Sequence, residues 1–277
     1  MADEQNTLAA MAVAVATEVA KDGYNDIAHP ALSAAGNVLA IIPQVIERAL
    51  LPVRQWVAEG QYKFKETQKL LEQKLQNTPP EQIVSPEPYV AVPALQAISY
   101  SMDNEEIRNM YANLLASSMS EKVKNDVHPA FVEIIKQLSP DEARILKFLF
   151  NGVGNEPIIH LRLVDKNTHG GVAVIRNFTQ LFRKVENLEQ KDYNKVAILL
   201  DNLSRQKLIE IHEGSYLTDS KRYEPLEQDG IVLSFKNQKI SDNQKWNIEK
   251  TYLDLTYLGK SFCQICIADE IKTVGLA

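Results

Sequence analysis

The sequence predicts a mainly α protein built from two modules. A multi-helix module is expected over residues 1–138, and a winged-helix-like α+β module over residues 139–277. In the first part, apolar residues recur at helical spacing; beyond residue 155, short strand-like runs alternate with helical ones. With 277 residues, 45% of them hydrophobic and 24% charged, the chain has the composition of a globular protein with a real core.

The N-terminal region contains two apolar segments. In residues 5–21 a stripe at helical spacing is formed by Leu8, Met11, Val15 and Val19. Residues 27–46 contain no Asp, Glu, Lys or Arg, and their length matches the roughly 20 residues that cross a bilayer. Prolines and polar residues dilute this run. We therefore expect a buried helix of a bundle, with membrane insertion through 27–46 as the alternative.

A charged helix, a short helix and a run of three further helices are predicted before residue 152. A charged helix covers about 60–76, and a proline-rich stretch follows it, in which Thr78 is placed to cap a short helix. Asp103 and Glu106 have the spacing of a capping pair before an amphipathic helix. A second helix follows Pro129, and Ser139 caps a third one over 140–151. The polar residues between these helices are thus explained by capping, so the segment is predicted to be a structural joint.

The C-terminal part has a different pattern. Strands are predicted at 157–164, 208–211 and 250–258, a turn at 167–171, a helix at about 193–207 and a closing helix after Leu258. This order resembles a winged-helix domain, with Leu255-Thr256-x-Leu258-Gly259-x-x-Phe262 as the resembling motif. The forty or so residues between the first helix and the recognition-like helix are more than a minimal winged helix contains.

The segment around the joint also resembles a known family. The runs Asn113-Leu114-Leu115-Ala116, His128 to Ile135 and Leu138 to Ala143, with the proline-rich lead-in at 83–88, look like the Abi-alpha family. The resemblance covers roughly 30–260. It implies a bacterial protein of abortive infection, a defence against bacteriophage, and it supplies no active site.

Charge and cysteine content narrow the functional classes. The net charge of −6 comes from residues 1–139, which hold 11 basic and 17 acidic side chains, whereas residues 140–277 hold 19 of each. Neither part has the positive excess of a general nucleic-acid binder. Two cysteines argue against a disulfide scaffold and for a reducing compartment, so a cytoplasmic location is expected, with membrane association as the variant.

A local nucleic-acid surface is the first candidate site. The outward face of the 193–207 helix and the wing region offer side chains that reach phosphates or bases, namely Lys195, Asn202, Arg205, Lys221 and Arg222. Asp201 lies among them and would repel phosphate. Because this half has no net charge, a protein-binding or structural role is favoured over DNA reading.

An RNase site is the second candidate. Arg162 and His169, and likewise Arg205 and His212, have the spacing of the Arg–His motif of HEPN ribonucleases, which this spacing resembles. In that family both residues lie on one helix, whereas here they fall in strands or at a helix end. We therefore expect the spacing to be a coincidence.

The sequence assigns no catalytic residue, metal ligand or cofactor. Cys263 and Cys266 form a lone C-x-x-C, without the second ligand pair of a zinc site, and are expected to pack in the core. Asp141 with Glu189 superficially suggests a metal-dependent nuclease, but capping explains Asp141 better. No phosphate-binding glycine loop and no nucleophile elbow are present.

The sequence therefore predicts a phage-defence effector or sensor that acts without catalysis. Its helical module would bind a protein partner, another copy or a membrane, and its second module would be an interaction platform. The alternatives are an RNase-type toxin that uses an Arg–His pair, a winged-helix DNA-binding regulator, and membrane damage by residues 27–46.

Overall fold

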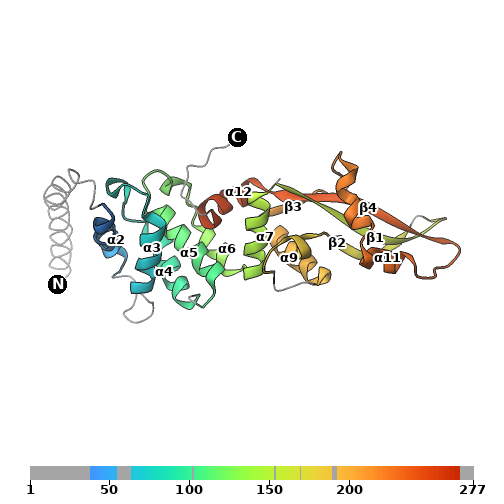
Figure 1. Ribbon diagram of the computed structural model, residues 1–277, viewed down its shortest axis with the longest axis horizontal. Helices are drawn as coiled ribbons and strands as arrows, with labels where there is room; N and C mark the ends of the chain where they lie inside the picture. The colour runs from blue at the N-terminus through green and yellow to red at the C-terminus, as the bar shows by residue number, and fades with distance from the viewer. Residues whose placement is uncertain are drawn as a thin grey trace, which may run out of the picture.

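The computed structural model describes residues 38–54, 64–101, 103–152, 154–168, 170–188 and 192–268. The molecule is elongated, with a helical half at one end and a sheet half at the other (Figure 1). Several sequence predictions lie outside the described residues: the stripe in 5–21, residues 27–37 of the uncharged run, His169 and Glu189.

The helical half is a bundle arranged around one central helix. Its elements are α2 (Val38–Arg54), α3 (Phe64–Leu75), η1 (Pro80–Gln82), α4 (Pro88–Tyr100), α5 (Glu105–Ser118), η2 (Lys124–Asp126) and α6 (Ala130–Lys136). Helix α5 contacts α3, α4, α6 and the first helix of the sheet half. Its central position explains why nine consecutive residues of α5, from Met110 to Ser118, are buried.

Two helix starts differ from the predicted ones. Asn104, not Asp103, caps α5: its side-chain oxygen accepts from the amide of Ile107 at 3.0 Å. Thr78 does not cap a helix, because Pro79 precedes a single 3-10 turn, Pro80–Gln82, that has no side-chain cap. The many prolines of this stretch remove amide donors, and this favours such short turns over a continued helix.

The third predicted helix is confirmed in full. It is α7 (Pro140–Asn151), and it begins with a capping box in which Ser139 and Glu142 bind each other's backbone amides. The Ser139 amide donates to the Glu142 carboxylate at 2.6 Å, and the Glu142 amide donates to the Ser139 hydroxyl at 3.3 Å.

The sheet half contains a four-stranded antiparallel sheet. The strands are β1 (Asn155–Asp165), β2 (Gly171–Phe178), β3 (Ile209–Ile211) and β4 (Gln244–Leu255), in the order β2-β1-β4-β3. The predicted strand 250–258 is shifted and lengthened, because β4 pairs with the whole of β1 from Asn155↔Asp254 to Asp165↔Gln244. Strand β2 was not predicted; Gly171 opens it where any Cβ would lie 2.4 Å from the Leu163 carbonyl oxygen.

Short helices surround this sheet. They are α8 (Leu181–Lys184), α9 (Tyr193–Arg205), η3 (Ser220–Tyr223), α10 (Glu224–Glu227), α11 (Gly230–Lys236), α12 (Tyr257–Phe262) and the π-helix η4 (Cys263–Ile267). The segment between β3 and β4 folds into η3, α10 and α11, whereas a plain two-stranded wing was expected. The fold is therefore mainly α, with an antiparallel sheet in the C-terminal half.

The last described segment, residues 256–268, returns to the helical half. Thr256 caps α12 by accepting from the Gly259 amide at 2.9 Å. A Cβ at Gly259 would lie 1.9 Å from the Leu208 carbonyl oxygen, so the close approach of α12 to β3 requires glycine there. From this junction α12 and η4 run back onto α5, as Figure 1 shows.

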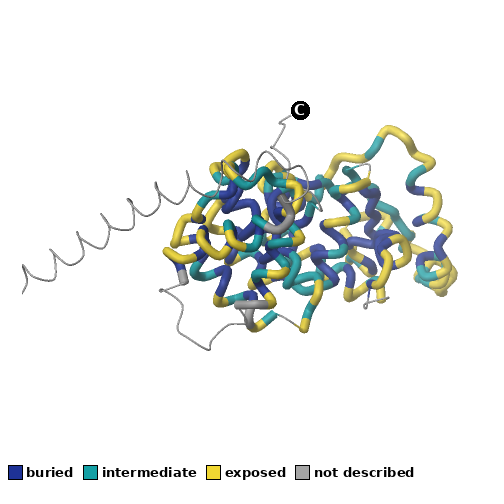
Figure 2. The backbone as a smooth tube through the Cα atoms, turned by 60° about the vertical axis from the view of Figure 1, so that its left-hand side comes forward, coloured by how far each residue is buried: buried dark blue, intermediate teal, exposed yellow. Residues whose placement is uncertain are grey.

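Both halves share one hydrophobic core. The buried apolar side chains form a single cluster that extends from Ile42 in α2 to Ile267 at the end of η4. Figure 2 shows buried segments in both halves. No helix among the described residues is long and apolar enough to span a membrane; residues 38–46 of the uncharged run belong to α2.

Candidate functional site

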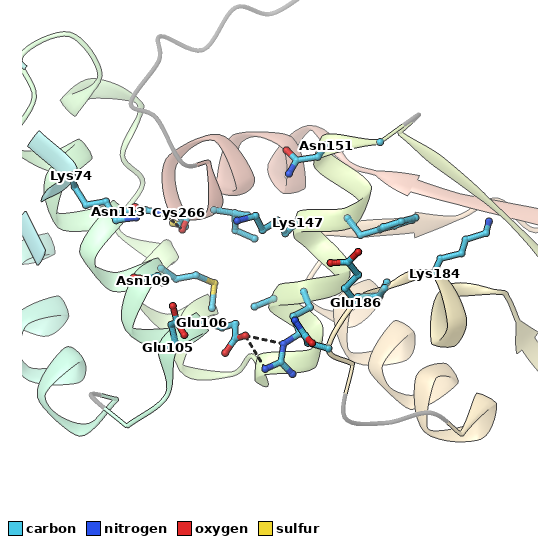
Figure 3. Close-up of a pocket in the computed structure, with 18 residues that line it drawn as sticks. Lys74, Glu105, Glu106, Asn109, Asn113, Lys147, Asn151, Lys184, Glu186 and Cys266 are labelled. Atoms are coloured by element: carbon cyan, nitrogen blue, oxygen red, sulfur yellow. Dashed lines mark hydrogen bonds and ion pairs between the residues drawn. The ribbon is translucent and has the colours of Figure 1, made fainter. Parts of the chain in front are cut away.

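A polar cleft lies between α5 and α7, where the helical half meets the sheet half (Figure 3). Its volume is about 640 Å³, within the range of small-molecule sites. The charged and amide residues that line it are Lys74, Glu105, Glu106, Asn109, Asn113, Arg144, Lys147, Asn151, Lys184, Glu186 and Asn187. Met110, Phe148 and Val185 also line the cleft, so it offers apolar surface together with both signs of charge.

An ion-pair network spans the cleft from α5 to α7. Arg144 donates from Nε to Glu106 Oε1 at 2.8 Å and from Nη1 to Asp141 Oδ1 at 2.7 Å. Burial alone would lower the pKa of the Arg144 guanidinium, but the hydrogen bonds with Glu106 and Asp141 outweigh it and raise that pKa. The network therefore stays charged and holds the first turns of α5 and α7 together.

A second bridge ties the end of the chain to α5. Asn113 Nδ2 donates to the carbonyl oxygens of Cys266 and Ala268 at 3.0 and 3.2 Å, and Ser117 Oγ donates to that of Ile265 at 3.3 Å. The carbonyls at a helix C-terminus have no partner within the helix, so these side chains supply one. Phe131 and Phe262 reinforce the bridge in an edge-to-face contact at 5.4 Å.

A third bridge joins α9 to the α6–α7 joint. Asn202 Nδ2 donates to the Glu142 carboxylate at 2.6 Å and to the Gln137 carbonyl at 3.1 Å. Arg205 Nη2 donates to Gln137 Oε1 at 3.0 Å. Glu142 thus belongs to the capping box of α7 and to this bridge at once, which fixes α9 against the helical joint.

The nucleic-acid candidates are therefore placed unequally. Asn202 and Arg205 take part in the third bridge, while Arg222 donates to the Asn155 carbonyl oxygen at 2.8 Å and supports the start of β1. Lys195 and Lys221 are exposed on α9 and η3. Nucleic-acid binding through these five residues stays a prediction.

The residues of the RNase candidate have separate partners. Arg162 donates to Glu249 at 3.0 Å across β1 and β4. His212 Nε2 lies 3.0 Å from Asp254 Oδ1, and its ring stacks on Tyr252 at 4.4 Å. Among the described residues, no hydrogen bond or ion pair connects Arg205 with His212. The Arg–His site stays a prediction.

The two cysteines lie inside the second bridge. Cys263 and Cys266 are free and fully buried in η4, and burial raises the pKa of both thiols well above its ordinary value. A protonated buried thiol is a poor nucleophile, so these groups are suited to packing. Within the described ranges, no group of three or more His, Cys, Asp or Glu side chains could hold a metal ion.

The sequence did not predict the bridges: Asn202, Arg205 and Glu106 were expected in other roles, and other members were missed. Asn113 was quoted only as part of a family-like run, and Gln137 was not singled out. A buried polar residue inside a helix with an apolar stripe is the one local signal for Asn113. It does not indicate which carbonyl the side chain binds, because that partner lies 153 residues away.

The comparison with family models decides the relationship of this chain. The model described as abortive infection alpha matches residues 59–266, which is most of the sequence. The chain belongs to the Abi-alpha family. The match covers most of both halves, from α3 to Cys266 in η4, and leaves α2 outside.

Two further comparisons add little. No curated protein matches the chain. A solved structure of an uncharacterized protein from the marine bacterium Alcanivorax borkumensis SK2 is similar, with 22% identity and a TM-score of 0.33, over 49% of this chain and 90% of that protein. A likeness of this degree carries no argument about fold or function.

Proposed function

We propose that this Abi-alpha member is a phage-defence protein that works as a non-enzymatic effector or sensor. Its helical half associates with a protein, another copy or a membrane, and its sheet half is a platform for a second interaction. The family match over residues 59–266 carries the proposal, because it extends over most of both halves. The two free cysteines support placing the protein in the cytoplasm.

The three bridges support the coupling that such a protein needs. Three contacts each connect the helical half with the following half: the Arg144–Glu106 pair, the Asn113 bonds and the bond from Asn202 to the Gln137 carbonyl. A ligand or partner that separates α5 from α7 would have to break the first of these. The cleft is therefore the place where binding on one side can change the arrangement of the other.

The winged-helix assignment of the sheet half belongs to this proposal. The chain order α7, α8, α9, β3, β4 and the pairing order β1-β4-β3 support it, with β2 as an added strand. In this arrangement α9 is the recognition-like helix, and its Asn202 and Arg205 bind the α6–α7 joint. This use of the helix favours a platform for protein contacts over a DNA reader.

The test is a plaque assay in cells that carry the gene, with membrane potential and RNA integrity followed after infection. We expect fewer plaques with the wild type, and a loss of protection with Arg144→Met. A matched control is Lys239→Met, which removes an exposed cation outside the cleft and outside α9.

The outcomes separate the alternatives. Protection that survives Arg144→Met would contradict the role of the cleft. Lost membrane potential with intact RNA would favour a membrane-directed effector. RNA cleavage that disappears with His212→Ala would overturn the non-enzymatic proposal and support the RNase alternative.

A further inference from the structure

His160 is a buried ionisable group that the proposed function does not use. It lies in the middle of β1, with 7% of its surface exposed. The backbone amide of Asn177 donates to its Nδ1 at 3.1 Å. Because Nδ1 accepts a hydrogen bond, the neutral ring carries its hydrogen on Nε2. That Nε2 is buried and, within the described part of the chain, forms no hydrogen bond.

Asn177 occupies an irregular part of β2. Where the pairing of β1 with β2 shifts register, Arg176 and Asn177 together lie opposite His160, which makes this part of β2 a β-bulge. The backbone of Asn177 has a φ of 51°, a left-handed conformation that residues with side chains seldom adopt. The hydrogen bond to His160 is therefore one of the contacts that hold the bulge in this conformation.

The side chain of Asn177 connects the ring to α9. Its Nδ2 donates to Asp201 Oδ1 at 3.0 Å, and this carboxylate is the charged group that α9 contributes here. Helix α9 lies beside β2 (Figure 1). The next residue of α9, Asn202, belongs to the third bridge. A continuous chain of contacts therefore runs from His160 through Asn177 and α9 to the α6–α7 joint.

Protonation reverses the role of Nδ1. An imidazolium donates from both nitrogens, so its Nδ1 hydrogen and the Asn177 amide hydrogen would point at each other with no acceptor between them. An acceptor lies on the other side of the ring: Glu213 Oε1 is 3.6 Å from Nε2, and the Glu213 side chain is 74% exposed, so it has room to approach. The neutral ring thus suits Asn177, and the charged ring suits Glu213.

We propose that His160 is a proton-operated latch between the sheet and α9. The neutral ring holds Asn177 and, through it, Asp201. The protonated ring releases Asn177 and pairs with Glu213, so α9 keeps its contact with the joint and loses one with the sheet. The inference rests on the proposed function, in which a change on one side alters the arrangement of the other, and it adds acidification as a signal that acts on this connection.

The surroundings of His160 set the direction of the response. Burial is the largest influence and lowers the pKa of the imidazole. Arg176 on β2 and Arg162 on β1 lower this pKa further. Glu213, just after β3, and Glu249 on β4 act in the opposite direction. The latch is therefore closed at a pH of about 6.5 and above, and it opens as the pH falls through the lowered pKa.

The test follows both ends of the latch in the full chain while the pH is lowered from about 7.5 to about 5. Nuclear magnetic resonance of the His160 ring reports its protonation. Hydrogen exchange, corrected for the intrinsic effect of pH, reports the protection of α9. We expect this protection to fall by up to about tenfold as the ring is protonated, the factor that corresponds to one lost hydrogen bond. His160→Asn, whose side-chain oxygen can accept from Asn177 at any pH, should show no such fall.

Three further variants separate the latch from a general loosening in acid. Asn177→Gly tolerates the left-handed φ and keeps the backbone amide, but it removes the bond to Asp201. In this variant His160 should still titrate, while α9 no longer responds. Glu213→Gln removes the acceptor and should move the opening to lower pH. Glu210→Gln, at an exposed position of β3, is its matched control and should leave the opening in place.

Four results would overturn the proposal. These are equal protection of α9 over the whole pH range, a fall that persists in His160→Asn, a fall that is undiminished in Asn177→Gly, and an opening that Glu213→Gln does not move. Circular dichroism confirms that each variant is folded at neutral pH, and the exposed Glu213 can be changed without disturbing the core. None of these measurements involves phage, so a failed latch leaves the plaque assay as an independent test of the defence function.

Discussion

The helical half excludes charge from its interior, whereas the sheet half buries ionisable side chains and pairs them. Among the described residues up to 138, the buried polar side chains are Thr67, Asn113, Ser117, Ser118 and Ser120. From residue 139 onward, carboxylates and a histidine are buried as well, namely Asp141, Glu142, Glu156, His160 and Asp229. The stability of the helical half therefore depends on how its apolar side chains pack. The stability of the sheet half depends in addition on charge pairing and on pH.

The buried carboxylates of the sheet half have basic partners within reach. Glu156 accepts from Lys184 at 2.5 Å, and Asp229 forms an ion pair with Arg183. Removing one member of such a pair leaves the other poorly solvated. This difference between the halves can be tested by changing one residue at a time in each half and measuring the stability of the protein and its dependence on pH.

The largest loss of stability is expected from a change in the apolar interior. Phe131→Ala removes a ring that is 1% exposed and packs on Phe262, so the free energy of unfolding should fall by about 3–5 kcal/mol. Urea denaturation followed by fluorescence and circular dichroism measures it. Ile198→Ala, on the exposed face of α9, should change stability by less than about 0.5 kcal/mol. Equal losses in the two variants would contradict the assigned core.

The second effect concerns a buried charge. Asp229→Asn keeps an oxygen to cap α11 but removes the negative charge beside Arg183, and should cost about 1.5–3 kcal/mol at pH 7. Burial would raise the pKa of the Asp229 carboxyl, but hydrogen bonds from Arg183, Ile231 and Gln180 lower it overall. This stabilisation is present above pH of about 4 and is lost as pH falls through the lowered pKa.

Acid titration of stability checks the sign of this effect. The wild type should lose stability more steeply below pH of about 4 than Asp229→Asn does. Glu210→Gln, at an exposed position of β3, is the control and should keep the steep acid limb. Parallel curves for the wild type and Asp229→Asn would show that the charge of Asp229 is not used in folding.

The third effect separates the closing helix from the bundle. Asn113→Ala leaves the carbonyls of Cys266 and Ala268 without their donor, and should cost about 1–2 kcal/mol, one net hydrogen bond for each. Hydrogen exchange should increase in η4 and α12 more than in the sheet. Uniform faster exchange over the whole chain would instead show that the two halves unfold only together.

The smallest effect is a pH dependence near neutrality. His160 is buried in β1 and accepts the Asn177 amide on Nδ1; burial lowers the pKa of its imidazole, although Glu213 and Glu249 act in the opposite direction. The unfolded chain then binds the proton more strongly, so stability is complete above pH of about 6.5 and falls as pH drops toward the lowered pKa. His160→Asn should remove this slope. A slope that persists in the variant would assign it to another group.

Local patterns in the sequence were sufficient for individual elements. The helix over 140–151 was predicted to the residue because its capping box and its apolar spacing lie within one segment. The strands at 157–164 and 208–211 were found within two residues of their ends, and the family was identified from the runs around the joint. The start of α5 was misplaced by one residue, because Asp103 and Asn104 are both good caps and only geometry chooses between them.

Contacts between distant segments could not be read in this way. Strand β2 exists because Gly171 lets the chain approach β1, and the length of β4 follows from its pairing with all of β1. The three bridges join residues 38, 60 and 153 positions apart in the sequence. Their side chains look like ordinary surface or capping residues until folding places them together.

The sequence by itself determined the capping box of α7, the apolar faces and the Abi-alpha membership, because each depends on residues within a short window. Only the tertiary structure decided the arrangement of the sheet, the return of the closing helix to α5 and the position of the polar cleft. The physical reason is that hydrogen bonds and ion pairs depend on distance and direction in space, and a polar side chain does not specify its partner until the backbone has fixed both.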